Sequence, residues 1–316
     1  MKILLPEGTD LRPELPDGVE AVTVDARRPV PPEHHDAEAA VVWAHLPTAL
    51  RSMARDLPRL RWVQSLSAGT DQLETAGFPD DVIITSGRGF HDRTVAEHAL
   101  ALTLAGLRRL PQMLRAQEER RWARELGGVA PLHPPGEITS LIEARVLVWG
   151  FGSIGQTLAP LLRSLGAEVR GVARTAGRRA GFDVVDEDHV ADELTRTDVL
   201  IMVLPSTAAT RHALDGRRLA LLPDHAWVVN VGRGSTVDEA ALVDALHEGT
   251  IGGAALDVTE TEPLPADSPL WTAPNIIISP HAAGGRPIGA SELISANLSA
   301  LLAGQPLRNV VERRPS

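Results

Sequence analysis

The chain lacks several features that mark common classes of protein. Its 316 residues include no cysteine, which excludes disulfide bonds, thiolate metal ligands and a cysteine nucleophile. Basic residues number 31 against 41 acidic ones, and the formal net charge of −10 argues against nucleic acid as the main partner. No apolar run approaches the ~20 residues that span a membrane, and residues 1–7 become acidic too soon for a signal peptide. We therefore expect a cytoplasmic protein that binds neither nucleic acid nor a membrane.

The chain also offers little for a metal ion. His34, His35 and Asp36 stand together in a proline-rich stretch, but no third ligand follows at helical spacing. We interpret this stretch as a solvated loop and predict no metal site.

A glycine pattern is the most informative feature that is present. The apolar residues 146–149 lead directly into Gly150, Gly152 and Gly155, and a helix-length segment, 156–165, follows. Strand, Gly-x-Gly-x-x-Gly and helix in this order are the context of a dinucleotide fingerprint. The first glycine permits a tight turn, the second lets a pyrophosphate approach the backbone, and the third lets the helix pack on the strand. The pattern predicts that a dinucleotide binds at the helix start.

Strand-like and helix-like segments alternate in two series. We expect strands at residues 2–5, 19–24, 40–44, 61–65 and 82–85, and again at 146–149, 168–172, 199–203, 226–230, 252–256 and 275–278. This alternation predicts an α/β fold with two doubly wound parallel-sheet domains.

The lengths of the remaining segments suggest how the two domains are connected. A long apolar helix is expected over residues 94–110, and residues 111–145 read as an excursion that could be an interface arm. The tail after residue 283 is too short for a third domain and is expected to return to the first. We therefore predict a Rossmann dinucleotide-binding domain, residues 94–283, inserted in a flavodoxin-like substrate domain, residues 1–93 and 284–316.

Three charged residues follow strands of the second series. They are Arg233, Glu262 and His281. Ligands of open α/β sheets bind outside the carboxyl ends of the strands, so the three side chains could converge there. An arginine can grip a carboxylate with two hydrogen bonds, a histidine can donate a proton, and a carboxylate beside it favours the protonated imidazole. This set is what the reduction of a 2-keto acid needs.

These motifs, taken together, resemble those of the D-2-hydroxyacid dehydrogenase family. The matching stretches are Val95-Ala96-Glu97-His98, residues 150–155, Leu204-Pro205, and residues 230–234, 257–264 and 279–284, in the order of the family. The resemblance implies that Arg233, Glu262 and His281 are catalytic. It implies that Ser67, Ala68 and Gly69, together with Arg233, bind the substrate carboxylate. It also implies a homodimer formed largely through the cofactor domain.

The same resemblance, with the glycine pattern, predicts the residues that bind the cofactor. They are Thr94, Gly150, Gly152, Ser153, Ile154, Gly155, Arg174, Thr175, Leu204, Pro205, Thr210, Val231, Gly232, Asp257 and Gly284. Among them, Asp257 matches the residue that holds the nicotinamide carboxamide.

One position departs from the pattern of NAD-preferring members. Where they carry an acidic residue after the second strand, this chain has Ala173, followed by Arg174 and then Arg178 and Arg179. Loss of the carboxylate removes repulsion toward a 2′-phosphate, and an arginine beside it can pair with that phosphate. The stretch is similar to that of NADPH-linked glyoxylate/hydroxypyruvate reductases. We expect NADP(H) to be favoured, with NAD(H) possible, and a small anionic 2-keto or 2-hydroxy acid, such as glyoxylate or hydroxypyruvate, as substrate.

Two other functions remain open. The first is a dehydrogenase of the same fold that acts on phosphite or formate. The Arg–Glu–His set disfavours formate, because that branch has a Gln–His pair, whereas phosphite enzymes keep the set. The second is a non-catalytic, NAD(P)-sensing binding protein like the corepressors of the family, although no basic or disordered appendage supports it.

Overall fold

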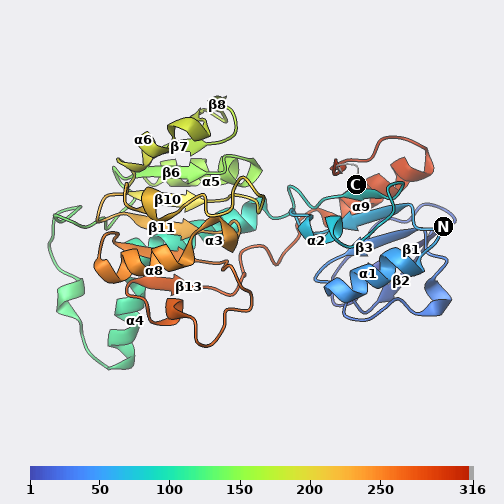
Figure 1. Ribbon diagram of the computed structural model, residues 1–316, viewed down its shortest axis with the longest axis horizontal. Coiled ribbons are helices and arrows are strands. Elements are labelled where there is room, and N and C mark those ends of the chain that lie inside the picture. The colour runs from blue at the N-terminus through green and yellow to red at the C-terminus, as the bar shows by residue number, and fades with distance from the viewer. Residues whose placement is uncertain (313–316) are drawn as a thin grey trace. The chain divides into compact units, whose positions relative to one another are not determined.

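A computed structural model describes residues 1–312 of the chain. Contacts divide it into two compact units. Of the described residues, the first unit comprises Met1–His91 and residues 286–312, and the second comprises Asp92–Gly285. Each unit is described by itself below (Figure 1).

The first unit is built on a five-stranded parallel sheet. Its strands are β1 (Lys2–Pro6), β2 (Glu20–Val24), β3 (Ala39–Val42), β4 (Trp62–Ser65) and β5 (Ile83–Thr85). They lie in the order β2-β1-β3-β4-β5, and every pair is parallel. This is the flavodoxin-like order. All five predicted strands are present, with ends shifted by at most two residues.

Helices cover both faces of this sheet. On one face, α1 (Pro47–Asp56) and α2 (Asp71–Glu74) pack on apolar strand residues. On the other face, α9 (Ala290–Leu302) buries Ile294 and Leu298 against Ile3, Val41 and Trp62. Alternate residues of a strand point to opposite faces, so a sheet covered on both sides needs continuous apolar runs. A short 3-10 turn, η1 (Pro32–His34), lies in the proline-rich loop.

The second unit is built on an eight-stranded sheet. Its strands are β6 (Arg145–Trp149), β7 (Glu168–Val172), β8 (Gly177–Arg179), β9 (Phe182–Val185), β10 (Val199–Met202), β11 (Trp227–Asn230), β12 (Gly253–Leu256) and β13 (Ile276–Ile278). They lie in the order β13-β12-β11-β10-β6-β7-β9-β8. All are parallel except β8, which pairs antiparallel with β9. The predicted parallel α/β architecture with a Rossmann sheet is confirmed.

The sequence prediction missed the hairpin of β8 and β9. Its turn consists of Ala180 and Gly181, both with positive φ (49° and 82°), as a tight two-residue hairpin turn requires. The β8 residues Gly177, Arg178 and Arg179 are polar, so no buried-strand pattern marks them. The hairpin extends the sheet beside β7, next to Arg174.

Two layers of helices cover the second sheet. On one face, α3 (Asp92–Leu107) and α5 (Ser153–Ser164) pack on residues such as Val146 and Val148. On the other face, α6 (Val190–Leu194), α7 (Gly216–Leu219) and α8 (Glu239–Glu248) pack on Leu147 and Trp149. Within the described residues, every helix is too short or too polar to cross a bilayer.

The helix predicted over residues 94–110 is present but ends earlier than predicted, and a second helix follows it. The first, α3, ends at Leu107, and α4 (Leu110–Glu118) begins after Arg109, whose φ of 53° is left-handed. Pro111 at the second position of α4 suits a helix start. Because α3 begins at Asp92, Thr94 lies in its first turn. The remaining 3-10 turns are η2 (Arg124–Leu126), η3 (Glu187–His189), η4 (Gly234–Thr236) and η5 (Pro269–Thr272).

Candidate active site

The glycine turn joins β6 to α5 and has the shape of an anion-binding turn. Gly150 has a φ of 105°, and a Cβ there would lie 2.5 Å from the carbonyl oxygen of Val203. A Cβ at Gly155 would lie 2.9 Å from the Gly150 oxygen. At Gly152, in contrast, a Cβ would meet no atom within 4 Å. The backbone there is open to a ligand, beside the N–H groups of Ser153 and Ile154, which an α-helix leaves without partners in its first turn.

The segment after β7 carries the exposed arginines. Arg179 donates to the carbonyl oxygen and the hydroxyl of Thr175, at 2.8 and 2.6 Å. Within residues 1–312, no hydrogen bond or ion pair joins Arg174 or Arg178 to another side chain. Two guanidinium groups are thus presented to solvent beside the end of β7, with no carboxylate paired to them.

Two other predicted cofactor segments contact each other. A Cβ at Gly232 would lie 2.6 Å from the carbonyl oxygen of Leu204, so the turn after β11 fits tightly against the segment after β10. That segment is braced by Thr210, whose hydroxyl donates to the Pro205 oxygen at 2.6 Å. The buried Asn230 shapes the other turn, because it accepts from the N–H of Gly232 at 3.0 Å and donates to the Arg233 oxygen at 3.1 Å.

Glu262 and His281 form a direct pair. The Nδ1 of His281 lies 2.7 Å from the Oε2 of Glu262, whose Oε1 accepts from the N–H of Thr259 at 3.2 Å. The hydrogen bond with Glu262 raises the pKa of His281, against the opposing effects of burial and of the Arg233 charge. Burial opposes ionisation of Glu262, yet the bond and charge of His281 lower its pKa overall. The pair therefore favours a carboxylate beside a protonated imidazole.

Arg233 lies close enough to this pair to affect it. Its positive charge lowers the pKa of both partners, after the larger effects named above. Its Nη1 donates to the Gly232 oxygen at 2.8 Å. Three residues on three separate segments of the chain therefore meet at the carboxyl edge of the second sheet.

A buried carboxylate fixes the loop that carries His281. Asp257 accepts from the hydroxyl of Ser279 at 2.6 Å, from the N–H of Ala282 at 2.8 Å and from that of Ala283 at 3.1 Å. Its carbonyl oxygen accepts from the N–H of His281 at 2.8 Å. His281 itself has a φ of 52°, a strained conformation that these bonds hold in place.

The sequence prediction assigned no role to two partners of Asp257. His98 of α3 places its Nε2 3.0 Å from the Ser279 hydroxyl and 3.1 Å from Asp257. Both residues stand in the quoted motifs, Val95-Ala96-Glu97-His98 and residues 279–284. That is the signal that could have drawn attention to them, since their mutual contact spans 181 residues.

The predicted substrate loop belongs to the first unit, whereas the other predicted site residues belong to the second. Ser67 accepts through its carbonyl oxygen from the N–H of Gly87 at 2.8 Å, and its own N–H donates to Ser65 at 3.0 Å. In the part of the chain that the structure describes, the N–H groups of Ala68 and Gly69 have no hydrogen-bond acceptor. They are available to an anion.

Comparison with known proteins places the chain in a family. The sequence pattern described as "D-isomer specific 2-hydroxyacid dehydrogenase, NAD binding domain" matches residues 100–283. Glyoxylate reductase of Aeropyrum pernix is 32% identical over 262 residues, which cover 81% of this chain and 77% of that protein. The chain belongs to the D-isomer specific 2-hydroxyacid dehydrogenase family. It is accordingly an oxidoreductase that uses a nicotinamide cofactor on 2-hydroxy acids, as the sequence predicted.

Two crystal structures resemble this dehydrogenase over nearly its whole length. A D-isomer specific 2-hydroxyacid dehydrogenase from Xanthobacter autotrophicus Py2, in complex with NADPH and MES, is 31% identical with a TM-score of 0.79 over 98% of both chains. The NADPH-dependent glyoxylate/hydroxypyruvate reductase of Sinorhizobium meliloti, in complex with NADP and malonate, is 30% identical with a TM-score of 0.75, over 100% of this chain and 99% of that one.

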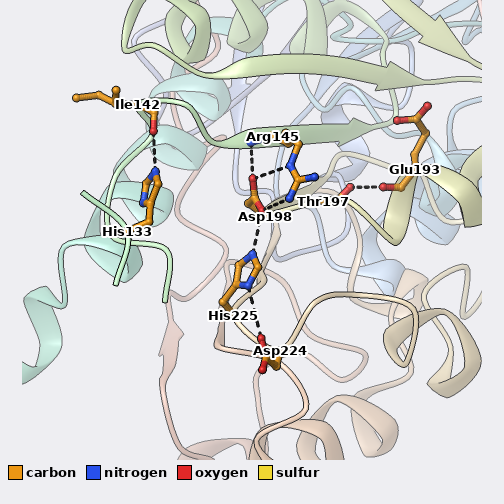
Figure 2. A network of polar contacts seen from close by, with 8 residues as sticks. All are labelled: His133, Ile142, Arg145, Glu193, Thr197, Asp198, Asp224 and His225. Carbon is orange, nitrogen blue, oxygen red and sulfur yellow. Dashed lines mark hydrogen bonds and ion pairs between the residues drawn. The ribbon is translucent and has the colours of Figure 1, made fainter. Parts of the chain in front are cut away.

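The dehydrogenase holds a second set of Arg, carboxylate and His at the amino edge of the same sheet. Asp198 accepts from the backbone N–H of Arg145 at 2.7 Å and from its Nε and Nη2 at 3.1 and 2.9 Å (Figure 2). His225 approaches the same carboxylate at 2.9 Å and lies 3.5 Å from Asp224 (Figure 2). A cavity of about 450 Å³ opens at this edge, lined by His225 and Trp227 among others. None of the predicted site residues lines it.

No group of three or more histidine or acidic residues that could hold a metal ion occurs among residues 1–312.

Proposed function

We propose that this dehydrogenase reduces small 2-keto acids, such as glyoxylate and hydroxypyruvate, to the 2-hydroxy acids, with NADPH as the favoured cofactor. The observation that carries the proposal is the His281–Glu262 pair at 2.7 Å, with Arg233 close by. The named activities of the relatives from Aeropyrum pernix and Sinorhizobium meliloti support the choice of substrate.

His281 is proposed to donate the proton of the reaction. Its Nδ1 is engaged by Glu262, so the proton leaves from Nε2 to the keto oxygen. The raised pKa of His281 extends the protonated imidazole to higher pH, and a general acid must carry its proton when the hydride arrives. In the reverse direction the neutral imidazole takes the proton of the hydroxyl group.

Arg233 is proposed to bind the substrate carboxylate. A guanidinium offers parallel N–H donors that match a carboxylate, and its charge polarises the neighbouring keto group. When His281 is protonated, its charge and that of Arg233 together outweigh the single charge of Glu262, which suits an anionic substrate. The role of Ser67, Ala68 and Gly69 in binding the same carboxylate stays a prediction.

The chain fits a phosphorylated dinucleotide. The open backbone at Gly152 and the N–H groups that begin α5 would hold the pyrophosphate, and Arg174 would pair with a 2′-phosphate. Asp257 would bind the carboxamide group of the nicotinamide. The reduced nicotinamide of such a cofactor supplies the hydride. The NADPH complex from Xanthobacter autotrophicus Py2 supports the preference.

Two copies of the chain are proposed to form a dimer through residues 110–142. Large apolar side chains gather in this segment with much of their surface exposed: Leu110 at 44%, Leu114 at 57%, Trp122 at 89%, Val129 at 108%, Leu132 at 41% and Ile142 at 49%. Exposure of several large apolar side chains in one segment favours their burial in an interface. Sedimentation of the wild type and of Trp122→Ser would test this, since a monomeric wild type contradicts it. The cytoplasmic location stays a prediction.

One absorbance assay of reduced nicotinamide tests the proposal. NADPH and NADH are each paired with glyoxylate, hydroxypyruvate, pyruvate and a branched 2-keto acid. We expect turnover with the two small acids and a preference for NADPH. Tight NADPH binding without turnover of any 2-keto acid would point to a sensing protein, and oxidation of phosphite with NADP⁺ in the reverse assay would point to a phosphite dehydrogenase.

A further inference from the structure

The residue two positions before Glu262 is held at its backbone by a carboxylate from another element. The N–H of Glu260 donates to the Oε1 of Glu239 at 2.5 Å. Glu239 is the first residue of α8 and is partly buried. The bond therefore ties the loop of residues 257–264, which carries Glu262, to the start of a helix that packs on the sheet.

The side chain of Glu260 is held as well. His212 places its Nε2 2.5 Å from the Glu260 carboxylate, and Arg211 lies 3.7 Å from it. Both residues belong to the segment after β10, which also contains Pro205 and Thr210. Glu260 thus links the loop of Glu262 to a predicted cofactor-binding segment.

The same peptide also lies against the turn that carries Arg233. A Cβ at Gly234 would lie 1.9 Å from the carbonyl carbon of Thr259 and 2.4 Å from the nitrogen of Glu260. The Thr259–Glu260 peptide therefore packs closely on Gly234, and the hydrogen bond to Glu239 ties it to the start of α8. The next residues along the loop reach Glu262, whose Oε1 accepts from the N–H of Thr259.

We propose that Glu239 is a positioning residue for the reaction. Its carboxylate fixes the Thr259–Glu260 peptide against Gly234, and so sets the place of the Glu262–His281 pair relative to Arg233. This role depends on an acceptor oxygen at the reach of a Glu side chain, not on its charge. The inference rests on the proposed function, in which Glu262 and His281 carry the proton step.

A structural role would have different requirements. An acid in the first turn of a helix stabilises the helix through its charge, whatever its length. Glu239→Asp keeps that charge but is one methylene shorter, so it cannot reach the Glu260 N–H. Glu239→Gln loses the charge but keeps both the reach and the acceptor oxygen. The two variants therefore separate positioning from helix stabilisation.

The test compares kcat, the KM for NADPH and the melting temperature of both variants with the wild type, using glyoxylate. We expect Glu239→Asp to lose between about 10- and 100-fold in kcat at an almost unchanged KM for NADPH, because a small displacement of a reacting group is costly. Glu239→Gln should stay within about threefold of the wild type. A Gln variant as impaired as the Asp variant, or an Asp variant with wild-type kcat, would overturn the proposal.

The pH dependence of kcat gives a second readout. Glu239 faces Glu260, Glu262 and His212, and its own pKa is raised by burial and by the two neighbouring carboxylates. A displaced Glu262 holds the proton of His281 less well, so the alkaline fall of kcat should move to lower pH in Glu239→Asp and stay in place in Glu239→Gln. If the wild type reduces glyoxylate and neither variant changes kcat or its pH profile, this inference fails while the proposed function stands. A wild type without turnover would instead remove the proposed function.

Discussion

Each of the two edges of the second sheet carries an arginine, a carboxylate and a histidine, in very different settings. At the amino edge, Arg145, Asp198 and His225 form a closed network in which the carboxylate receives four contacts (Figure 2). The side chain of Asp198 is 8% exposed. At the carboxyl edge, Glu262 is 38% and His281 48% exposed, and only the Nδ1 side of His281 is paired among the described residues. In the first set both ring nitrogens of His225 approach a carboxylate, whereas in the second the Nε2 of His281 stays open to a ligand.

The difference shows that residue type alone does not identify a catalytic set. Burial opposes ionisation of Asp198, but the hydrogen bonds from Arg145 and His225 lower its pKa overall. The charged carboxylate of Asp198 thus links β10 to Arg145 of β6 and to His225, which precedes β11. The pKa of His281 is raised by Glu262 while its other nitrogen remains available, which is the arrangement of a proton donor. Position at the carboxyl edge and an open side of the imidazole separate the two.

The largest expected effect comes from replacing the histidine of each set, because only His281 is proposed to donate a proton. His281→Ala should lower turnover of glyoxylate by about 10²- to 10⁴-fold, the usual contribution of a general acid, and leave the Kd for NADPH nearly unchanged. His225→Ala is the matched control and should keep kcat within about twofold. Steady-state kinetics and fluorescence titration of NADPH measure both. Turnover of His281→Ala equal to that of His225→Ala would remove the assignment.

The arginines give the next largest effect. Arg145 is paired with Asp198, but Arg174 faces no acid in the described chain. We expect Arg174→Ala to weaken NADPH binding by about 10- to 100-fold, the worth of a charge-assisted hydrogen bond to phosphate, and to change NADH binding little. Arg217→Ala, another exposed arginine, on α7, serves as the charge-matched control. An equal loss for both cofactors would contradict a contact with the 2′-phosphate.

Most strands of the second sheet could be predicted from the sequence, because their burial on both faces leaves a clear pattern. A parallel strand covered on both faces must be apolar throughout, so runs such as residues 146–149 and 199–202 are recognisable. The hairpin of β8 and β9 lies at the edge of the sheet and is partly polar, so it left no such signal. Its turn is marked only by Gly181, which is too weak a sign by itself.

The site could be predicted at its strand ends but not in its supporting contacts. Arg233 and His281 each stand three residues after the end of a strand, β11 and β13, and the fold brings such positions to one edge. The contacts of Glu239 with Glu260 and of His98 with Ser279 join segments far apart in the chain, through single side-chain atoms. No periodicity encodes them, because they depend on the final packing of helices on the sheet.

A smaller effect is expected when the amino-edge carboxylate is neutralised. Asp198→Asn should lower the free energy of unfolding by about 1–3 kcal/mol at neutral pH, because hydrogen bonds to a charged group are lost while Arg145 stays partly solvated. Its kcat should be close to that of the wild type. The pKa of Asp198 is lowered in the folded state, so its contribution is present above the usual carboxyl pKa and is lost as the pH falls through the folded value. Urea titrations at neutral and acid pH should therefore show a difference that shrinks in acid.

The smallest shift in a measured quantity is expected along the pH axis, when the carboxylate of the carboxyl edge is neutralised without being displaced. Glu262→Gln removes the main cause of the raised pKa of His281. Reduction needs the protonated imidazole and fails as the pH rises through that pKa, so the alkaline fall of kcat should begin at lower pH in the variant. Oxidation of the 2-hydroxy acid needs the neutral imidazole, and its rise with pH should also begin at lower pH. Both limbs must move together because they report the same proton. If the fall of kcat for reduction and the rise of kcat for oxidation moved in opposite directions, or both to higher pH, His281 would not be the group that titrates.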